Sequence, residues 1–266
     1  MKSFLYILFN EVKRFLTIKE YRTLLFLALR YGFSKRYDAK EIKFKGNVFL
    51  VADFQSFFWQ YKQIYVDQCY RFTADGSSQI ILDCGANVGL SALYFSQYYP
   101  NATVLAFEAD ATIFKYLNTN VETNKMRHVE ALQKAVWIND EGVRFAEEGA
   151  DGGAVSQSTG IAVESISLSA VILKYETVDL LKMDIEGAEV EVIRSCKEVL
   201  HKCKNVFIEY HSFTGQAQHL HELLGILVNN GFRYYIKEEV VLNQPFVSKG
   251  NSGNMDMQIN IFAYKI

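Results

Sequence analysis

The spacing of apolar positions changes along the chain, and this change predicts how the chain is organised. Beyond residue 78, short continuous apolar runs alternate with longer segments in which apolar residues recur at helical spacing. Continuous runs suit strands buried on both faces, and the alternation is typical of a parallel sheet with crossover helices. An α/β domain is therefore expected. Its strands are predicted near 80–83, 103–108, 129–133, 178–184, 205–209, 232–236 and 258–264.

Residues 2–31 follow a different pattern, with two amphipathic helical stretches that contain Lys and Arg. Residues 1–45 hold 11 Lys or Arg and 4 Asp or Glu, a net charge of +7, whereas the rest of the chain carries −9. The longest apolar run, Leu24–Leu29, is far shorter than the roughly 20 residues that cross a bilayer. We therefore predict a basic helical extension over 1–45, followed by the main domain over 46–266. The extension packs on the main domain or on a second subunit, or it rests a basic amphipathic surface on an anionic membrane.

The cysteines and the first apolar stretch bear on the compartment. The four cysteines lack the CxxC spacing of a metal site, which fits a reducing compartment. No small-residue cleavage site follows the first apolar stretch, so a secretory leader is not expected. A cytoplasmic protein is expected, and the membrane interpretation would place it at the inner membrane face.

Three further segments stand outside the strand–helix alternation. Residues 42–54 read as a hairpin that turns at Gly46–Asn47. Residues 56–70 form an aromatic helix that belongs to the core or to a pocket wall. Residues 137–176 read as an antiparallel insertion on the sheet edge, with strand-like alternation at 143–145 and 163–168. The glycine-rich stretch 148–153 within it either covers the site or is a solvated hairpin loop.

A glycine turn follows the first predicted strand and suits a ligand site. Asp83-Cys-Gly-Ala-Asn-Val-Gly89 leads into a helix, and glycines let the backbone approach a ligand closely. A dinucleotide fingerprint would place glycine at 87 and 90, where Asn87 and Leu90 stand, and the chain lacks the Gly-Lys-Ser/Thr of a P-loop. Glu108 ends the next strand, 19 residues after Gly89. At that position a carboxylate can accept hydrogen bonds from both hydroxyls of a ribose.

This Asp-x-Gly-x-Asn-x-Gly pattern resembles the first motif of Rossmann-like methyltransferases, which bind S-adenosylmethionine. Gln133 ends the third strand, which in that fold lies beside the adenine. The residues expected to contact the cofactor are therefore Asp83, Gly85, Ala86, Asn87, Gly89, Leu90, Glu108 and Gln133.

A second group of ionisable residues is predicted at the same edge of the sheet. Asp184 ends the fourth strand, residues 185–189, which include Glu186, open the next helix, and Glu209 and His211 end the fifth strand. Ligands of open α/β sheets bind beyond such carboxyl ends. Lys182 shares a strand face with Asp184, so it forms a structural ion pair or belongs to the site.

Within this group, His211 is the first choice for a general base because its unperturbed pKa lies near neutrality. Glu209 or Asp184 could orient or replace it. No metal is expected, although Asp184, Glu186 and Glu209 could alternatively hold Mg²⁺.

Leu181-Lys-Met-Asp-Ile-Glu-Gly-Ala-Glu189, together with the glycine turn, resembles the FkbM family of S-adenosylmethionine-dependent methyltransferases. Ile208-Glu-Tyr-His211 and Asn230-Gly-Phe232 add to this likeness, which covers residues 60–264. It implies a Rossmann-like seven-stranded sheet, mostly parallel with an antiparallel last strand. It also implies methyl transfer to a hydroxyl, on a sugar of a polysaccharide or on a natural product.

Two other functions stay open from the residues alone. They are an NAD- or nucleotide-dependent enzyme on a similar sheet and a binding protein without chemistry. A nucleic-acid substrate is not expected, because the main domain is acidic and has no basic stripe.

Overall fold

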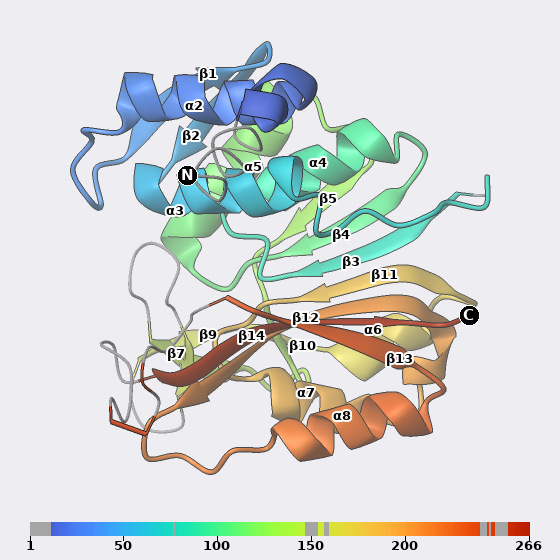
Figure 1. Cartoon of the computed structure of the whole chain (residues 1–266). Coiled ribbons are helices and arrows are strands. Elements are labelled where there is room, and N and C mark those ends of the chain that lie inside the picture. The colour runs from blue at the N-terminus through green and yellow to red at the C-terminus, as the bar shows by residue number, and fades with distance from the viewer. Residues whose placement is uncertain are drawn as a thin grey trace.

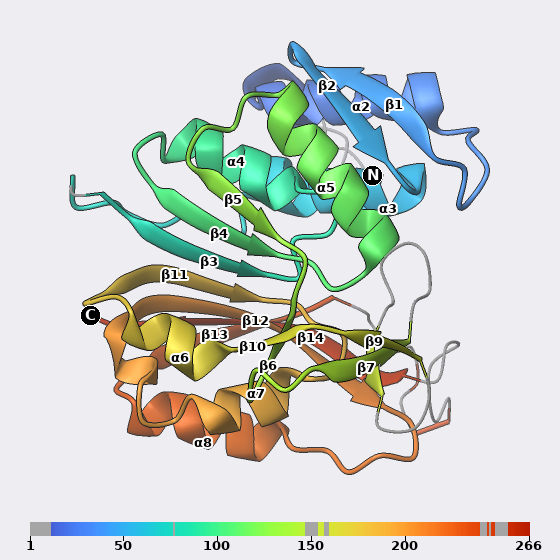
Figure 2. The same cartoon turned by 180° about the vertical axis from the view of Figure 1, so that it is seen from behind.

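A seven-stranded sheet runs through the centre of the molecule, with helices on both of its faces (Figures 1 and 2). The computed structural model describes residues 12–76, 78–146, 154–156, 160–239, 244, 246–247 and 255–266. The strand order is β13-β14-β12-β11-β3-β4-β5. In chain order these strands are β3 (Ile80–Cys84), β4 (Thr103–Phe107), β5 (Val129–Leu132), β11 (Val178–Met183), β12 (Cys203–Phe213), β13 (Arg233–Glu238) and β14 (Met255–Tyr264).

The strand directions confirm the predicted fold class. β5, β4, β3, β11 and β12 pair in parallel, and β14 runs antiparallel between β12 and β13. All six residues of β11 are buried, as expected for a central strand covered on both faces. Successive residues of β3 face opposite sides, so Ile81 packs into one apolar core and Leu82 into the other.

The helices divide between the two faces of the sheet (Figure 1). Asp110 begins α5 by accepting hydrogen bonds from the backbone N–H groups of Thr112 and Ile113, at 2.7 and 2.9 Å. Gly231 follows α8 with a positive φ, which suits the end of a helix. One face carries α4 (Leu90–Tyr98) and α5 (Ala111–Thr123), and the other carries α6 (Leu168–Leu173), α7 (Glu189–Ser195) and α8 (Leu220–Asn229).

The N-terminal segment packs on helices α5 and α4. Asn120 of α5 accepts a hydrogen bond from Leu50 N at 2.7 Å and donates to the carbonyl oxygens of Leu50 and Val88, both at 2.8 Å. It thereby joins the N-terminal hairpin to the turn that follows β3. The segment contains α2 (Lys19–Tyr31), β1 (Lys40–Phe44), β2 (Asn47–Val51), α3 (Phe54–Tyr61) and the π-helical turn η1 (Lys62–Val66).

The hairpin and the aromatic helix differ slightly from expectation. The hairpin turns at Lys45–Gly46, one residue earlier than predicted, because both residues take the positive φ that the turn needs and Asn47 already pairs with Phe44. The aromatic helix begins at Phe54, where Asp53 caps it. The division of the chain at residue 45 stays a prediction, and the hairpin spans it.

Within the segment, Leu24 and Leu27 of α2 are buried against the rest of the chain. In the part of the chain that the structure describes, no helix has the length and apolar character to cross a bilayer.

Residues 137–176 contain more structure than an edge insertion. β7 pairs antiparallel with β8 and with β9 in a small sheet of their own, and β10 pairs in parallel with β6 (Figure 2). The expected continuous strand over 163–168 was wrong, because Ser167 caps a helix that begins at Leu168. The glycine-rich stretch 148–153 lies outside the described residues. The strands here are β6 (Ala135–Trp137), β7 (Val143–Ala146), β8 (Ala154–Ser156), β9 (Ile161–Val163) and β10 (Ser165–Ser167), and a 3₁₀ turn, Leu200–Lys202, precedes β12.

Two element boundaries near the carboxyl edge also differ from expectation. β12 continues to Phe213, because its partner β14 is long enough to pair with it to the end, so Glu209 and His211 lie within the strand. Helix α7 begins at Glu189 and not at residue 185, since Glu186 and Gly187 take positive φ values of 54° and 97°. Residues 185–188 therefore form a turn at the edge of the sheet.

Candidate active site

A cavity of about 650 Å³ opens at the carboxyl ends of β3, β4 and β11. Its volume lies within the roughly 300–1,000 Å³ typical of small-molecule sites. This is the edge where the chain order of the sheet reverses, between β3 and β11, and where open α/β sheets bind ligands. The wall includes Gly85, Ala86, Asn87, Glu108, Lys182, Asp184, Glu186, Glu209 and His211.

The turn after β3 is shaped by close packing against the neighbouring strand. Gly85 has φ of 78°, and a Cβ added there would lie 1.8 Å from the carbonyl oxygen of Asp184. The backbone N–H groups of Gly85 and Ala86 donate to the carbonyl oxygen of Phe107, at 3.0 and 2.8 Å. Only glycine fits this position, and its fit brings β3, β4 and β11 together at the cavity.

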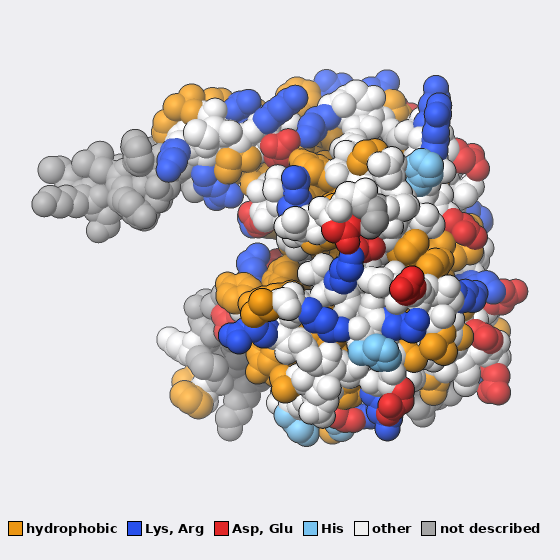
Figure 3. Space-filling model, turned by 90° about the vertical axis from the view of Figure 1, so that its right-hand side faces the viewer, with side chains coloured by type: hydrophobic (Ala, Val, Ile, Leu, Met, Phe, Trp, Pro, Cys, Tyr) orange, Lys and Arg blue, Asp and Glu red, His pale blue; other side chains and the backbone are white. Residues whose placement is uncertain are grey.

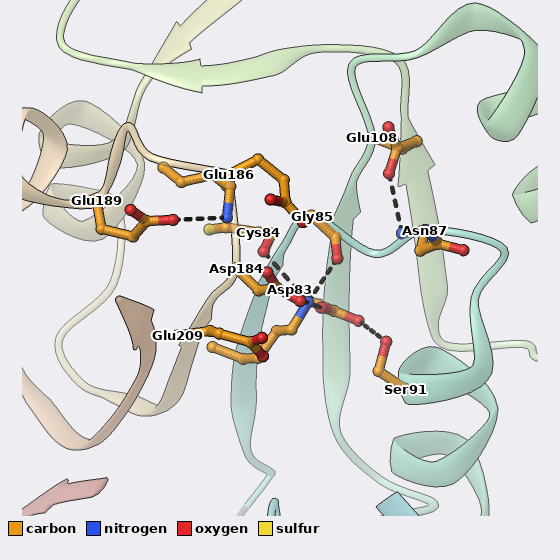
Figure 4. Close-up of polar contacts among 12 residues, drawn as sticks. Asp83, Cys84, Gly85, Asn87, Ser91, Glu108, Asp184, Glu186, Glu189 and Glu209 are labelled. Atoms are coloured by element: carbon orange, nitrogen blue, oxygen red, sulfur yellow. Dashed lines mark hydrogen bonds and ion pairs between the residues drawn. The ribbon is translucent and has the colours of Figure 1, made fainter. Parts of the chain in front are cut away.

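Glu108 projects from the end of β4 into the wall of the cavity and is 9% exposed. One carboxylate oxygen accepts a hydrogen bond from Asn87 N at 2.9 Å (Figure 4), and the other accepts one from Asp110 N, also at 2.9 Å. Burial raises the pKa of Glu108 to about 7, although these two hydrogen bonds oppose the shift. The carboxylate is thus held in a fixed orientation and can accept further hydrogen bonds from a ligand.

Asp83 and Lys182 form a buried ion pair between β3 and β11. Lys182 Nζ lies 3.2 Å from Asp83 Oδ1 and 3.8 Å from Asp184 Oδ2, and it donates to the carbonyl oxygens of Cys84 and Gly85. Burial lowers the pKa of Lys182, but the carboxylates of Asp83 and Asp184 outweigh burial and raise it. The residue is therefore a structural ion-pair partner that also borders the cavity.

Asp184, Glu186, Glu209 and His211 converge at one end of the cavity, and we call them the acid–imidazole cluster. Figure 4 shows the three carboxylates on one side of Gly85, with Glu108 and Asn87 on the other. His211 Nε2 lies 3.6 Å from Glu186 Oε2 and 3.7 Å from Glu209 Oε1. The structure thus brings together the four side chains that the sequence placed at adjoining strands.

Glu189 completes the surroundings of His211 and was not singled out from the sequence. Its carboxylate is fully buried, lies 3.0 Å from His211 Nδ1 and accepts a hydrogen bond from Gly187 N at 3.0 Å. The only signal in the sequence was the last Glu of the Ile185-Glu-Gly-Ala-Glu motif. An acidic residue in the first turn of a helix is ordinarily explained by the helix dipole, so this signal was not specific.

The cluster holds an excess of negative charge, which shifts its pKa values. Burial raises the pKa of Glu186 to about 9 and of Glu209 to about 8, and neighbouring carboxylates add to both shifts. Burial lowers the pKa of His211, but Glu189, Glu186 and Asp184 outweigh it and raise the value to about 10. The near-neutral pKa that favoured His211 as general base does not hold in these surroundings. Its role as base stays a prediction.

Several predicted cofactor contacts lie away from the wall of the cavity. Asp83 and Leu90 are buried behind it, and a Cβ at Gly89 would meet the side chain of Leu117. Gln133 is exposed, and the wall is lined instead by the residues that follow it, 134–136.

The N-terminal segment supplies the opposite wall through Arg36, Gln55, Ser56, Trp59, Gln60, Gln63 and Ile64. The aromatic character of residues 56–70 was the only sequence signal for this wall.

Comparison with known proteins gave one family match and several relatives. The profile of the Methyltransferase FkbM domain matches residues 83–234. Methyltransferase sdnD of Sordaria araneosa is 31% identical over 207 residues, which cover 62% of this chain and 78% of that protein. The 2-O-methyltransferase NoeI of Sinorhizobium fredii is 30% identical over 157 residues, covering 49% and 63%. Among solved structures, M. jannaschii TYW2 in complex with AdoMet has a TM-score of 0.46 at 15% identity, covering 88% of this chain and 89% of that one.

Proposed function

Because the chain belongs to the FkbM family of S-adenosylmethionine-dependent methyltransferases, we propose that it transfers a methyl group to a hydroxyl oxygen of a sugar or natural-product acceptor. The observation that carries this proposal is that Glu108 and the acid–imidazole cluster line a single cavity. One end is suited to a ribose and the other to a hydroxyl that must lose its proton.

The residues of the first end fit the cofactor. Glu108 would accept hydrogen bonds from the two ribose hydroxyls, and Asn87 N and Asp110 N hold its carboxylate for that contact. Such bonds to a charged acceptor contribute about 1.5–3 kcal/mol each. When bound, S-adenosylmethionine supplies an electrophilic methyl group on a positively charged sulfonium. The carboxylates along the wall suit that charge.

The cluster supports oxygen as the atom that is methylated. An alcohol gives up its proton reluctantly, and a positioned base accelerates such a transfer by roughly 10²–10⁴-fold. His211 and Glu209 are the two candidates for that base. Glu189 occupies Nδ1 of His211, so Nε2 is the nitrogen that faces the other carboxylates. The relative NoeI, named as a 2-O-methyltransferase, also supports an oxygen acceptor.

The wall from the N-terminal segment supports a sugar as the acceptor. Trp59 is 61% exposed beside the cavity, with Gln55 and Gln63 on the same wall. A flat aromatic face can pack on the apolar face of a sugar ring, and amide side chains can both donate to and accept from its hydroxyls.

The proposal is tested with S-adenosylmethionine labelled in the methyl group and cell-envelope sugar fractions as acceptors. We expect label to enter carbohydrate as an ether that survives mild alkali. Label released by alkali, or found only in protein or nucleic acid, would contradict the assignment. Glu108→Gln, which alters the proposed ribose contact, should lower this labelling. Glu130→Gln, at an exposed glutamate on β5, is the matched control and should not.

The exposed side chains of the N-terminal extension support a second part of the proposal, that the extension contacts an anionic membrane surface. Phe26, Leu29 and Phe33 are 49%, 83% and 100% exposed, beside the basic Arg22 and Arg30. Figure 3 shows hydrophobic and basic side chains together along the upper edge of the molecule. Apolar side chains flanked by basic ones are the composition of helices that lie in a membrane interface.

A further inference from the structure

We propose that the acid–imidazole cluster is a binding site for a divalent first-row cation, with Asp184, Glu186 and His211 as its ligands and Mn²⁺ as the ion it suits best. One ligand atom from each of these three side chains lies within 4.8 Å of the other two. A cation between them would therefore need only small side-chain rotations to be coordinated by all three.

The unpartnered nitrogen of His211 is an independent sign of a missing ligand. The side chain is 1% exposed, and its Nε2 has no hydrogen-bond partner among the described residues. Buried polar atoms almost always have a partner, so an orphaned one needs an explanation. This atom faces Glu186 and Glu209 at 3.6 and 3.7 Å, and a cation seated among them would occupy its lone pair.

Glu189 orients the imidazole as metal sites require. Ligating histidines almost always donate their other ring N–H to a carboxylate or carbonyl, which fixes the tautomer and the ring orientation. Here His211 Nδ1 lies 3.0 Å from the fully buried Glu189 Oε1. With Nδ1–H donated to Glu189, a cation at Nε2 would displace the proton that the surrounding carboxylates favour there and would bind the lone pair that this frees.

The charges around the cluster favour a divalent cation. Lys182 is already paired: its Nζ lies 3.2 Å from Asp83 Oδ1 and 3.8 Å from Asp184 Oδ2. Among the described residues, Glu186, Glu189 and Glu209 have no Lys or Arg within ion-pair distance, although Lys182 lowers the pKa of Glu209 from farther away. Buried carboxylates are costly unless paired, and an ion of charge +2 would offset this excess.

The donor set points to the kind of ion. Two carboxylate oxygens and one imidazole nitrogen suit Mn²⁺ better than Mg²⁺, because Mg²⁺ prefers oxygen donors alone. The set also lacks the thiolates that are common in structural zinc sites. Three protein ligands leave positions open for an acceptor hydroxyl and water.

The role of the ion rests on the proposed function. A cation held by Asp184, Glu186 and His211 would make an acceptor hydroxyl more acidic, and the carboxylate of Glu209 would take its proton. The oxygen would then bond to the methyl carbon as the carbon–sulfur bond breaks, and that electron pair would stay on sulfur as a neutral thioether. This arrangement makes His211 a ligand and Glu209 the base.

The test uses the full chain stripped of metal with a chelator and titrated with MnCl₂, with free Mn²⁺ followed by electron paramagnetic resonance. We expect one equivalent to bind, and we expect Glu186→Gln and His211→Asn each to weaken binding about tenfold or more. Glu130→Gln should leave binding unchanged. The site is overturned if the unaltered protein binds no Mn²⁺ at millimolar concentration, or if Glu186→Gln binds it as tightly as the unaltered chain.

A second titration separates this inference from the proposed function. S-adenosylhomocysteine is titrated into the same metal-free protein, because its proposed binding site at Glu108 does not involve the cation. Binding of S-adenosylhomocysteine without Mn²⁺ binding would end the cation site and leave the methyltransferase assignment intact. If His211→Asn does not fold, the unaltered chain and Glu186→Gln decide the question, because Glu186 lies in a turn with its side chain 24% exposed.

Discussion

Replacing Glu108 with glutamine separates the cost of burying a carboxylate from its use in binding. The two carboxylate oxygens accept hydrogen bonds from Asn87 N and Asp110 N. Glutamine offers one oxygen and one NH₂ group, so one of these N–H groups loses its acceptor. That loss costs about 1–3 kcal/mol and does not depend on pH.

The pH-dependent part follows from the pKa of about 7, raised by burial from the ordinary value of 4.5. Below pH 4.5 the folded and unfolded chains both hold the proton, and Glu108 makes no difference. Between 4.5 and 7 the unfolded chain loses the proton while the folded chain keeps it, so stability falls as pH rises. The loss is about 1.4 kcal/mol per pH unit and levels off above pH 7 at roughly 3 kcal/mol.

The assay is urea unfolding of both proteins at pH 5 and pH 8. We expect the free energy of unfolding of Glu108→Gln to improve relative to the unaltered chain by about 2–3 kcal/mol between these two pH values. Glu130→Gln should follow the unaltered chain. A difference that is the same at both pH values would refute the claim that Glu108 is buried at a cost.

The same variant should lose cofactor affinity. Ribose hydroxyls that donate to an ionised carboxylate contribute about 1.5–3 kcal/mol each, so the dissociation constant for S-adenosylhomocysteine at pH 8 should rise by at least about tenfold. A variant that is more tolerant of high pH and still binds as tightly would show that Glu108 does not contact the cofactor.

Three other substitutions test the imidazole, the buried ion pair and the N-terminal extension. His211→Asn should bind S-adenosylhomocysteine normally but lose turnover by roughly 10²–10⁴-fold, and partial rescue by excess Mn²⁺ would favour a ligand over a base; unchanged turnover would remove both roles. Lys182→Met should lower the free energy of unfolding by about 3–5 kcal/mol in urea titrations, because it leaves Asp83 charged, buried and unpaired; a loss below 1 kcal/mol would contradict the ion pair. Leu29→Glu should abolish flotation with anionic vesicles at low salt without lowering the melting temperature, whereas Leu173→Glu, also at an exposed apolar position, should float normally; equal flotation of both would exclude the extension as the contact.

The part of the site that forms within one strand–turn–helix unit could be predicted from local sequence. The apolar run of β3, the glycine turn and the acid that ends β4 are neighbours in sequence or one crossover apart, so spacing was enough to place Gly85 beside Glu108. The antiparallel place of β14 could be expected only from the family resemblance, because nothing in the periodicity of a strand reports its direction.

The missed features depend on contacts between distant segments. His211 lies within β12 because β14 pairs with it as far as Phe213, and that length is decided some 45 residues later in the chain. Glu189 looked like an ordinary acidic residue of a first helical turn until the fold brought it to His211. The wall that contains Trp59 likewise depends on distant contacts, because α3 packs on α4 and Asn120 joins the neighbouring hairpin to the turn after β3.

The most direct measurement of the central claim, that one cavity seats S-adenosylmethionine beside a proton-accepting cluster, is calorimetric titration of the purified chain with S-adenosylhomocysteine. We expect one site per chain, weakened by Glu108→Gln and unchanged by Glu130→Gln. No heat of binding with either S-adenosylhomocysteine or S-adenosylmethionine would contradict the account.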